Sequence, residues 1–212
     1  KIVLFTSEIP HNLKKYFQIT KDPGYYLKIK SNKHKGKKGF IRYLSKKRGE
    51  LLLLSRYDGN KSRGVVELID LNNFSILHSW EPNIKKIHDA TDISKEEFKD
   101  FKEDLSKERF IIIHPLLLEN GDLLFNGTSP LIKIDFCSNI LWINDIDEFH
   151  HANNIDEEGN YWVPSTKFPS SVDERLIGKE FGSFIDDAIT KISSDGKILY
   201  QKSIAEIFIE NG

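Results

Sequence analysis

The sequence contains no methionine and only one cysteine, Cys137, among its 212 residues. A single cysteine cannot form a disulfide within the chain, and it excludes a metal site built from several thiolates. No apolar run approaches the roughly 18 residues that a membrane-spanning helix requires, and the N-terminal residues lack the pattern of a signal peptide. The missing methionine predicts that a segment has been removed from the front of the translated protein.

Negative charge is scarce in the N-terminal part of the chain. Residues 1–48 hold 14 of the 31 lysines and arginines, but only two of the 32 acidic residues, Glu8 and Asp22. A phosphate-rich partner or an anionic membrane surface would suit such a basic segment. A solvated hairpin loop explains the same residues without a partner. We prefer the loop, and we expect strands in this segment that lead into the next domain.

Short β-branched or aromatic runs dominate the chain after residue 48, separated by turn-forming pairs such as Asn-Gly and Asp-Gly. The overall composition, 39% hydrophobic and 30% charged, is typical of a soluble globular protein. Runs and turns of this kind indicate antiparallel sheets. We predict strands over residues 49–55, 64–71, 74–80, 121–127, 130–136, 139–144, 159–165, 187–193 and 196–203.

Three of these regions are copies of one unit, in which an apolar strand, a polar turn and an Ile-Leu pair precede a histidine or an aromatic residue. The copies lie at residues 66–80, 131–145 and 188–202. A further strand precedes each copy and is opened by Gly49, Gly121 or Gly159. The four-stranded blades of a β-propeller have this period and texture. The sequence therefore predicts an all-β fold with about three propeller blades over residues 49–212.

Two insertions interrupt the repeat. Residues 92–108 are predicted to form a short helix, because Ser94 and Glu97 make a capping-box pattern and the apolar side chains share one face. Residues 166–184 form a loop punctuated by proline and glycine, which joins two strands of one blade. Long loops in a compact domain often cover or bind a ligand.

Histidines occupy nearly the same position relative to the glycine that opens the next strand in two copies of the repeat. We call this position the histidine station. His114 lies seven residues before Gly121, and His151 lies eight residues before Gly159. In a propeller, the segment that leads into an inner strand lies near the mouth of the central channel. A histidine at that station either binds a ligand or forms hydrogen bonds between neighbouring blades, and for His114 the two interpretations are equally supported.

The residues around His151 resemble a known family. The run His151-Ala152-Asn153-Asn154-Ile155, followed by an acidic turn and a Gly-Asn strand, looks like the His-x-Asn-x-Ile element of the bacterial arylsulfotransferases. Residues 64–82 and 187–201 are similar to other blades of that family. The resemblance covers roughly residues 49–202. It implies a six-bladed propeller that moves a sulfuryl group from one phenol to another, with no cofactor and no metal.

The resemblance also implies roles for single residues. His151 matches a group that binds and polarises the sulfuryl group, and His150, Asn153 and His114 are further candidates for substrate binding. The histidine that carries the sulfuryl group comes from a later blade in the family, and no residue of this chain matches it. We therefore expect an aryl sulfate or another small anionic or phenolic ligand, and remaining blades supplied by the same protein or another chain. Without those blades the chain is not expected to turn over.

By the same resemblance, we expect a periplasmic or exported protein, with any signal or membrane anchor in the missing N-terminal segment. A cytoplasmic location remains open.

Two other functions compete with sulfuryl transfer. The propeller could be a non-catalytic module that binds proteins or glycans, since the fold alone does not select a function. A cation could bind near Asp145, Asp147, Glu148 and the two histidines, although no metal-binding spacing is present. Nucleic acid is not an expected partner, because no recognition motif accompanies the basic segment.

Overall fold

The computed structural model describes residues 39–40, 49–95, 98, 106–127, 129–172 and 184–211. Almost all of the basic segment 1–48 therefore lies outside the described residues, as does most of the helix predicted over 92–108. The loop predicted over 166–184 is described at its ends only, up to residue 172 and from residue 184. The described part of the chain is mostly strand, with two short helices.

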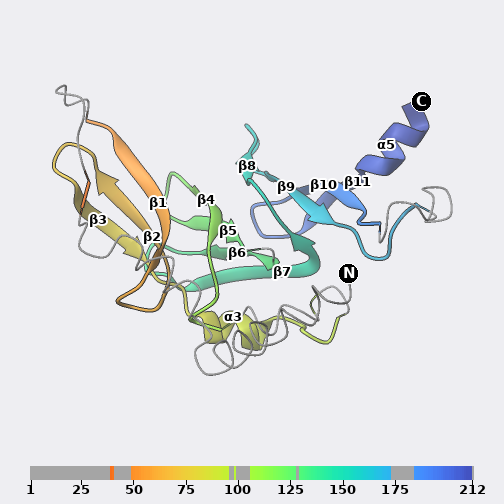
Figure 1. The fold of residues 1–212 in the computed structure, drawn as a ribbon. Coiled ribbons are helices and arrows are strands. Elements are labelled where there is room, and N and C mark those ends of the chain that lie inside the picture. Colours follow the sequence, from red (N-terminus) through yellow and green to blue (C-terminus); the bar gives the residue numbers. More distant parts are fainter. Residues whose placement is uncertain are drawn as a thin grey trace, which may run out of the picture.

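The strands form three antiparallel meanders that follow one another along the chain. The first is a three-stranded sheet in the order β1-β2-β3, and the second has four strands in the order β4-β5-β6-β7. Their bounds are β1 Leu51–Asp58, β2 Arg63–Asp70, β3 Ser75–Trp80, β4 Ile113–Leu117, β5 Leu123–Asn126, β6 Ser129–Ile134 and β7 Ile140–Phe149. Figure 1 shows the two meanders side by side, in the order of the sequence.

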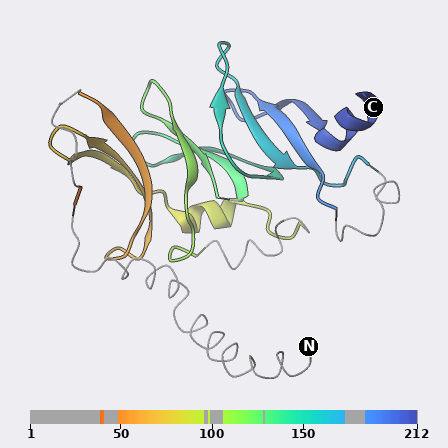
Figure 2. The same cartoon turned by 45° about the horizontal axis from the view of Figure 1, so that its top comes forward.

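The third meander consists of β8, β9, β10 and β11, each paired with the next. Its strands run over Asn154–Ile155, Tyr161–Thr166, Asp187–Ile192 and Ile198–Ser203. The second and third meanders are joined into one sheet only where the end of β7 pairs with the end of β9, at Glu148↔Thr166 and Phe149↔Ser165. Figure 2 shows the third meander beside the second.

The strands predicted from the sequence are confirmed, but two others were missed. These are β4, which contains His114, and β8, which lies between His151 and Gly159. In β4, Pro115 and a bulge interrupt the strand pattern, and β8 has only two residues. Each completes a four-stranded meander, so the unit is longer by one strand than the repeat read from the sequence.

The three predicted hairpins share one backbone geometry. Each has a shift of register near the end of its first strand, at Leu68/Ile69, Lys133/Ile134 and Lys191/Ile192. Each turn also contains a left-handed residue at the corresponding position, namely Phe74, Ser138 and Gly196, with φ of 62°, 68° and 88°. Because an extra residue in the left-handed conformation is a common way to close a hairpin, the repeat extends to the conformation of the backbone.

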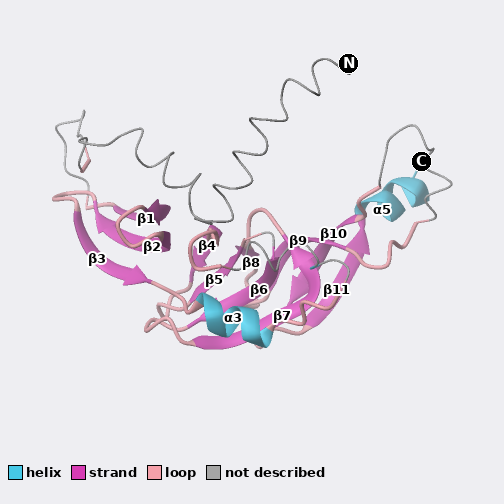
Figure 3. Cartoon of the chain, turned by 60° about the horizontal axis from the view of Figure 1, so that its bottom comes forward, coloured by secondary structure: helices cyan, strands magenta, loops and turns pink. Residues whose placement is uncertain are grey.

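The two helices were not predicted from the sequence. Helix α3 (Ile84–Ala90) follows the first meander, and the side chain of Asn83 accepts a hydrogen bond from Lys86 N at its start. Figure 3 shows α3 lying against the second meander, where Ile84 and Ile87 are buried in the core. Helix α5 (Ile204–Asn211) follows β11 and buries none of its residues. Neither helix has the length and apolar character needed to span a membrane, nor does any other helix among the described residues.

The second meander has both faces buried. Leu123 and Phe125 of β5 contribute to a core shared with the first meander, where Val66 and Trp80 are buried. Leu124, between them, points to the opposite face and packs in a second core with Tyr161 and Val163 of the third meander. Since successive residues of a strand alternate between faces, burial on both sides explains the uninterrupted apolar run of β5.

A side chain at one repeated position links the first meander to a hairpin turn of the second, and the second meander to a hairpin turn of the third. His78 Nε2 lies 2.8 Å from Phe136 O, and its ring stacks on Phe136 at 3.7 Å between centroids. Trp142 occupies the corresponding position in the second meander, and its Nε1 donates to Ser194 O at 3.1 Å. The third residue at this position is Tyr200, which is exposed. The meanders therefore contact one another by a repeated rule.

Gly196 tests this contact. An added Cβ would lie 2.8 Å from Trp142 Cδ2, and the residue is left-handed with φ of 88°. Gly159 is also left-handed, with φ of 80°, but a Cβ there meets nothing within 4 Å. We expect Gly159→Ala to lower the free energy of unfolding by about 1 kcal/mol, the cost of the conformation alone. Gly196→Ala should cost about 1–3 kcal/mol more, because of the clash. Equal shifts in urea midpoint would contradict the contact.

Candidate functional site

His151 lies in the connection between β7 and β8, with its side chain exposed. Its backbone is left-handed, with φ of 59°. This conformation is uncommon for a residue other than glycine, and it persists only where the surrounding structure holds it. The left-handed residue and the two-residue strand that follows place His151 at the junction of the second and third meanders.

His114 lies at the equivalent station of the preceding repeat, but within a strand. It is the second residue of β4, it is exposed, and its φ is 45°. The pairing of β4 with β5 shifts register between Ile113 and Leu116, so His114 and Pro115 form a bulge. Bulges redirect side chains and occur often beside functional sites. The sequence identified the shared station, and the structure adds the shared left-handed backbone.

Two asparagine side chains connect the backbones of these histidines. Asn153 Nδ2 donates to His114 O at 2.9 Å. Asn126 Nδ2 lies 3.1 Å from Asn153 Oδ1 and 3.3 Å from His151 O. Hydrogen bonds of Asn126, which the sequence analysis did not name, and of Asn153 thus link the backbones of His114 and His151. Nothing in the sequence marks Asn126 as a site residue, because it looks like any other polar residue at the end of a strand.

His150 points away from the solvent, unlike its neighbour. Its side chain is only 15% exposed, and Nε2 lies 3.3 Å from Asp187 Oδ1. Neither ring nitrogen makes a well-aligned hydrogen bond among the described residues, so the contact with Asp187 is an ion pair only when the imidazole is protonated. The rings of His150 and His151 meet edge to face, with centroids 4.8 Å apart. His150 thus supports His151 from below the surface.

Burial lowers the pKa of His150, and His151 acts in the same direction, whereas the carboxylate of Asp187 raises it. Burial prevails, so the folded protein favours the neutral imidazole. The unfolded chain then binds the proton more readily than the folded protein. The stability contribution of His150 therefore decreases as the pH falls below the ordinary histidine pKa of about 6.5.

The acidic residues near His150 do not converge on a common point. Asp145, Asp147 and Glu148 lie on strand β7, not in a loop. Asp145 accepts a hydrogen bond from Asp92 N, whereas Asp147 is buried and accepts one from Gln201 Nε2. In the part of the chain that the structure describes, no group of three or more histidine, cysteine, aspartate or glutamate side chains could hold a metal ion.

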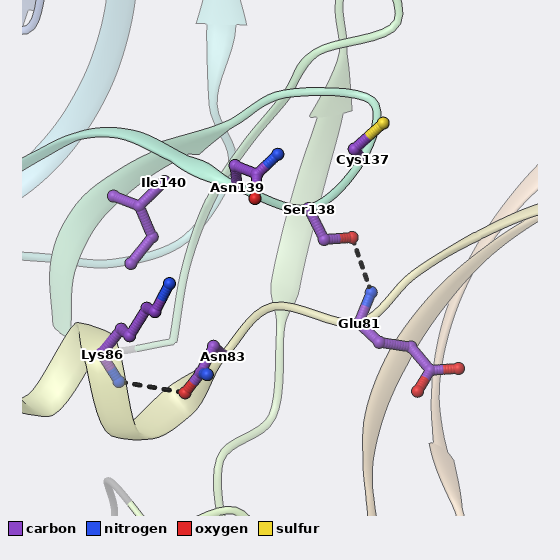
Figure 4. Close-up of a pocket in the computed structure, with 7 residues that line it drawn as sticks. All are labelled: Glu81, Asn83, Lys86, Cys137, Ser138, Asn139 and Ile140. Carbon is purple, nitrogen blue, oxygen red and sulfur yellow. Dashed lines mark hydrogen bonds between the residues drawn. The ribbon is translucent and has the colours of Figure 1, made fainter.

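A pocket of about 340 Å³ lies at another junction, between the first and second meanders. Figure 4 shows it between the start of α3 and the β6–β7 turn, where Glu81 N donates to Ser138 Oγ. The residues that line it are Glu81, Asn83, Lys86, Cys137, Ser138, Asn139 and Ile140. None of them is a histidine. None takes part in the amide bridge, which is the set of hydrogen bonds that Asn126 and Asn153 make with each other and with His114 O and His151 O. This pocket is therefore separate from the candidate site.

The repeated meanders, with histidines at equivalent junctions, define a β-sheet repeat protein whose candidate site is built from one station of each repeat. Residues 114–212 match the family model described as arylsulfotransferase (ASST). The match confirms the resemblance to this family over residues 114–212. The match begins at His114 and includes His151 and Asn153, whereas residues 49–113 lie outside it. No curated protein sequence matches the chain.

The titration of His150 tests its environment. We expect its imidazole resonances in NMR spectra to titrate below pH 6.5, and Asp187→Asn to lower this pKa further, because the variant removes the carboxylate that favours the imidazolium. Asp195→Asn, which alters an exposed aspartate in the β10–β11 turn, is the matched control and should leave the titration unchanged. A pKa at or above 6.5, or one unaffected by Asp187→Asn, would be inconsistent with this geometry.

Proposed function

We propose that the protein transfers a sulfuryl group from an aryl sulfate to a phenol. The aryl O–S bond of the donor breaks and an S–O bond to the acceptor oxygen forms, while the proton of the acceptor phenol ends on the released phenol. Negative charge spreads over the sulfuryl oxygens during transfer, so the reaction needs positioned hydrogen-bond donors and a source of protons. Histidine side chains supply both near neutral pH.

The observation that carries the proposal is the family match over residues 114–212, which contains both histidine stations and the asparagine that joins them. His151 is the proposed sulfuryl-binding group, because it is exposed and its backbone is held in place at the junction. Asn153 and His114 complete the binding side of the site, and His150 supports His151. The residue that carries the sulfuryl group would come from outside this chain. A periplasmic or exported location would be consistent with this proposal.

We propose further that the three meanders are consecutive blades of a β-propeller. Support comes from the four strands of the second and third meanders, from the cores between successive meanders, and from the repeated contact that His78 and Trp142 make with the following turn. Tyr200 occupies the next equivalent position, and 47% of it is exposed. By the same rule, its hydroxyl would donate to a carbonyl in the turn of a further blade, whether from the same protein or from another chain.

Tyr200→Phe tests the propeller proposal in the full-length protein. Removal of the hydroxyl should lower the free energy of unfolding by about 0.5–1.5 kcal/mol, the usual value of one hydrogen bond. Trp142→Phe removes the equivalent bond to Ser194 O and calibrates the size of the effect in the same urea titration. If Trp142→Phe destabilises the protein and Tyr200→Phe does not, no further blade contacts Tyr200.

His151→Ala tests the proposed function. With 4-nitrophenyl sulfate as donor and phenol as acceptor, the variant should lose about 10²–10³-fold in kcat, the usual effect of removing one stabilising donor. His88→Ala is the control, because His88 lies on α3, and it should retain full activity. Equal activity in the two variants would remove His151 from the mechanism. If the wild-type protein transfers no sulfuryl group, the non-catalytic binding module becomes the better account.

A further inference from the structure

Asn126 is the last residue of β5 and is fully buried. Its neighbour across the sheet is Ile113, the residue before His114. Its side chain contacts the backbone oxygen of His151 and the side chain of Asn153. A single amide group in the second meander therefore stands between the two histidine stations.

The orientation of both amide groups in this bridge is fixed by the backbone. His114 O and His151 O can only accept hydrogen bonds, so the groups that face them must be the NH₂ ends of Asn153 and Asn126. Asn153 Oδ1 is then left to accept from Asn126 Nδ2, at 3.1 Å. The reverse orientation would place two acceptors against each other at each end of the bridge.

Both histidines that the bridge contacts have an unfavourable backbone. A left-handed conformation costs about 1–2 kcal/mol for a residue with a side chain, and φ is 45° at His114 and 59° at His151. In each case the carbonyl oxygen of the strained residue is the atom that an asparagine amide contacts. The amides therefore stabilise the conformation that gives the exposed imidazoles their directions.

Asn126 also carries a cost that stability alone does not explain. Its Oδ1 is buried and has no hydrogen-bond partner among the described residues. An unpaired buried oxygen costs about 1–3 kcal/mol, and an apolar residue at the end of β5 would avoid this penalty. The amide NH₂ of Asn126, which donates to both His151 O and Asn153 Oδ1, is useful mainly if function requires a fixed geometry of the two histidine stations.

We infer that Asn126 is a positioning residue, which couples the backbone of His151 to that of His114 through Asn153. The inference rests on the proposed function for its effect on catalysis, but the coupling is a property of the folded protein alone. Asn126 does not reach the reacting atoms, because its side chain is fully buried. It acts by holding two exposed histidines, from successive meanders, in one arrangement.

The test compares Asn126→Ala with Asn144→Ala in the full-length protein. Asn144 is also buried in the second meander, and its Nδ2 donates to a backbone carbonyl of the third, Gly196 O, at 2.8 Å. We expect Asn126→Ala to raise KM for 4-nitrophenyl sulfate and to lower kcat/KM by about 10–100-fold, as a small misplacement of binding groups does. Asn144→Ala should leave KM unchanged. A merely structural role for Asn126 would reduce the folded fraction and leave KM unaltered, which would overturn the inference.

A second measurement does not depend on activity. In spectra of protein labelled with ¹³C-histidine, Asn126→Ala should shift the resonances of both His114 and His151, and Asn144→Ala should shift neither. A shift confined to His151 would disprove the coupling. Should Asn126→Ala fail to fold, Asn153→Ala, which alters a half-buried residue of the same bridge, should shift His114. If the wild-type protein has no transferase activity, the proposed function fails, while the spectra still decide whether the stations are coupled.

Discussion

The burial of both faces of the second meander is the constraint on which the rest of the structure depends. Leu123, Phe125, Ile132 and Ile134 face the first meander, while Leu124 and Leu131 face the third. A sheet covered on both sides fixes its two neighbours at the packing distance of sheets, about 10 Å. It also places the connection that leaves each meander beside the start of the next. His114 lies in the first strand of the second meander and His151 in the connection that leaves it, so their spacing follows from the packing of the apolar layers.

The candidate site combines this apolar framework with a small polar bridge. Backbone strain at His114 and His151 is held by hydrogen bonds from two asparagine amides, which suits a site whose binding groups must keep a fixed geometry. His150 has a different role, because its ring is buried beside His151 and contacts Asp187. Of the two adjacent histidines, His151 faces the solvent, and His150 lies beneath it and packs against its ring.

The repeat could be predicted from the sequence because its hairpins are specified by residues that are close together in the chain. Hairpins such as Asp135–Asn139 and Ser193–Lys197 carry polar turn residues between apolar strands, and such turns are recognised from a few neighbouring residues. Strand β4 was not predicted because a bulge at Pro115 interrupts its alternation of apolar and polar residues. Strand β8 was not predicted because its two residues are too few to show an alternation. Helix α3 was missed because its apolar contacts, through Ile84 and Ile87, are supplied by a distant sheet.

The sequence by itself determined the positions of all strands but β4 and β8, the hairpins and the matching stations of His114 and His151, since each depends on residues close together in the chain. It also carried the family resemblance, through His151, Asn153 and Ile155. Only the tertiary structure decided which side chains join the stations. Asn126 and Asn153 are separated by 27 residues, and nothing local distinguishes Asn126 from another polar strand end. The packing of one meander against the next brings the two amides together, and packing is the property that a single sequence does not display.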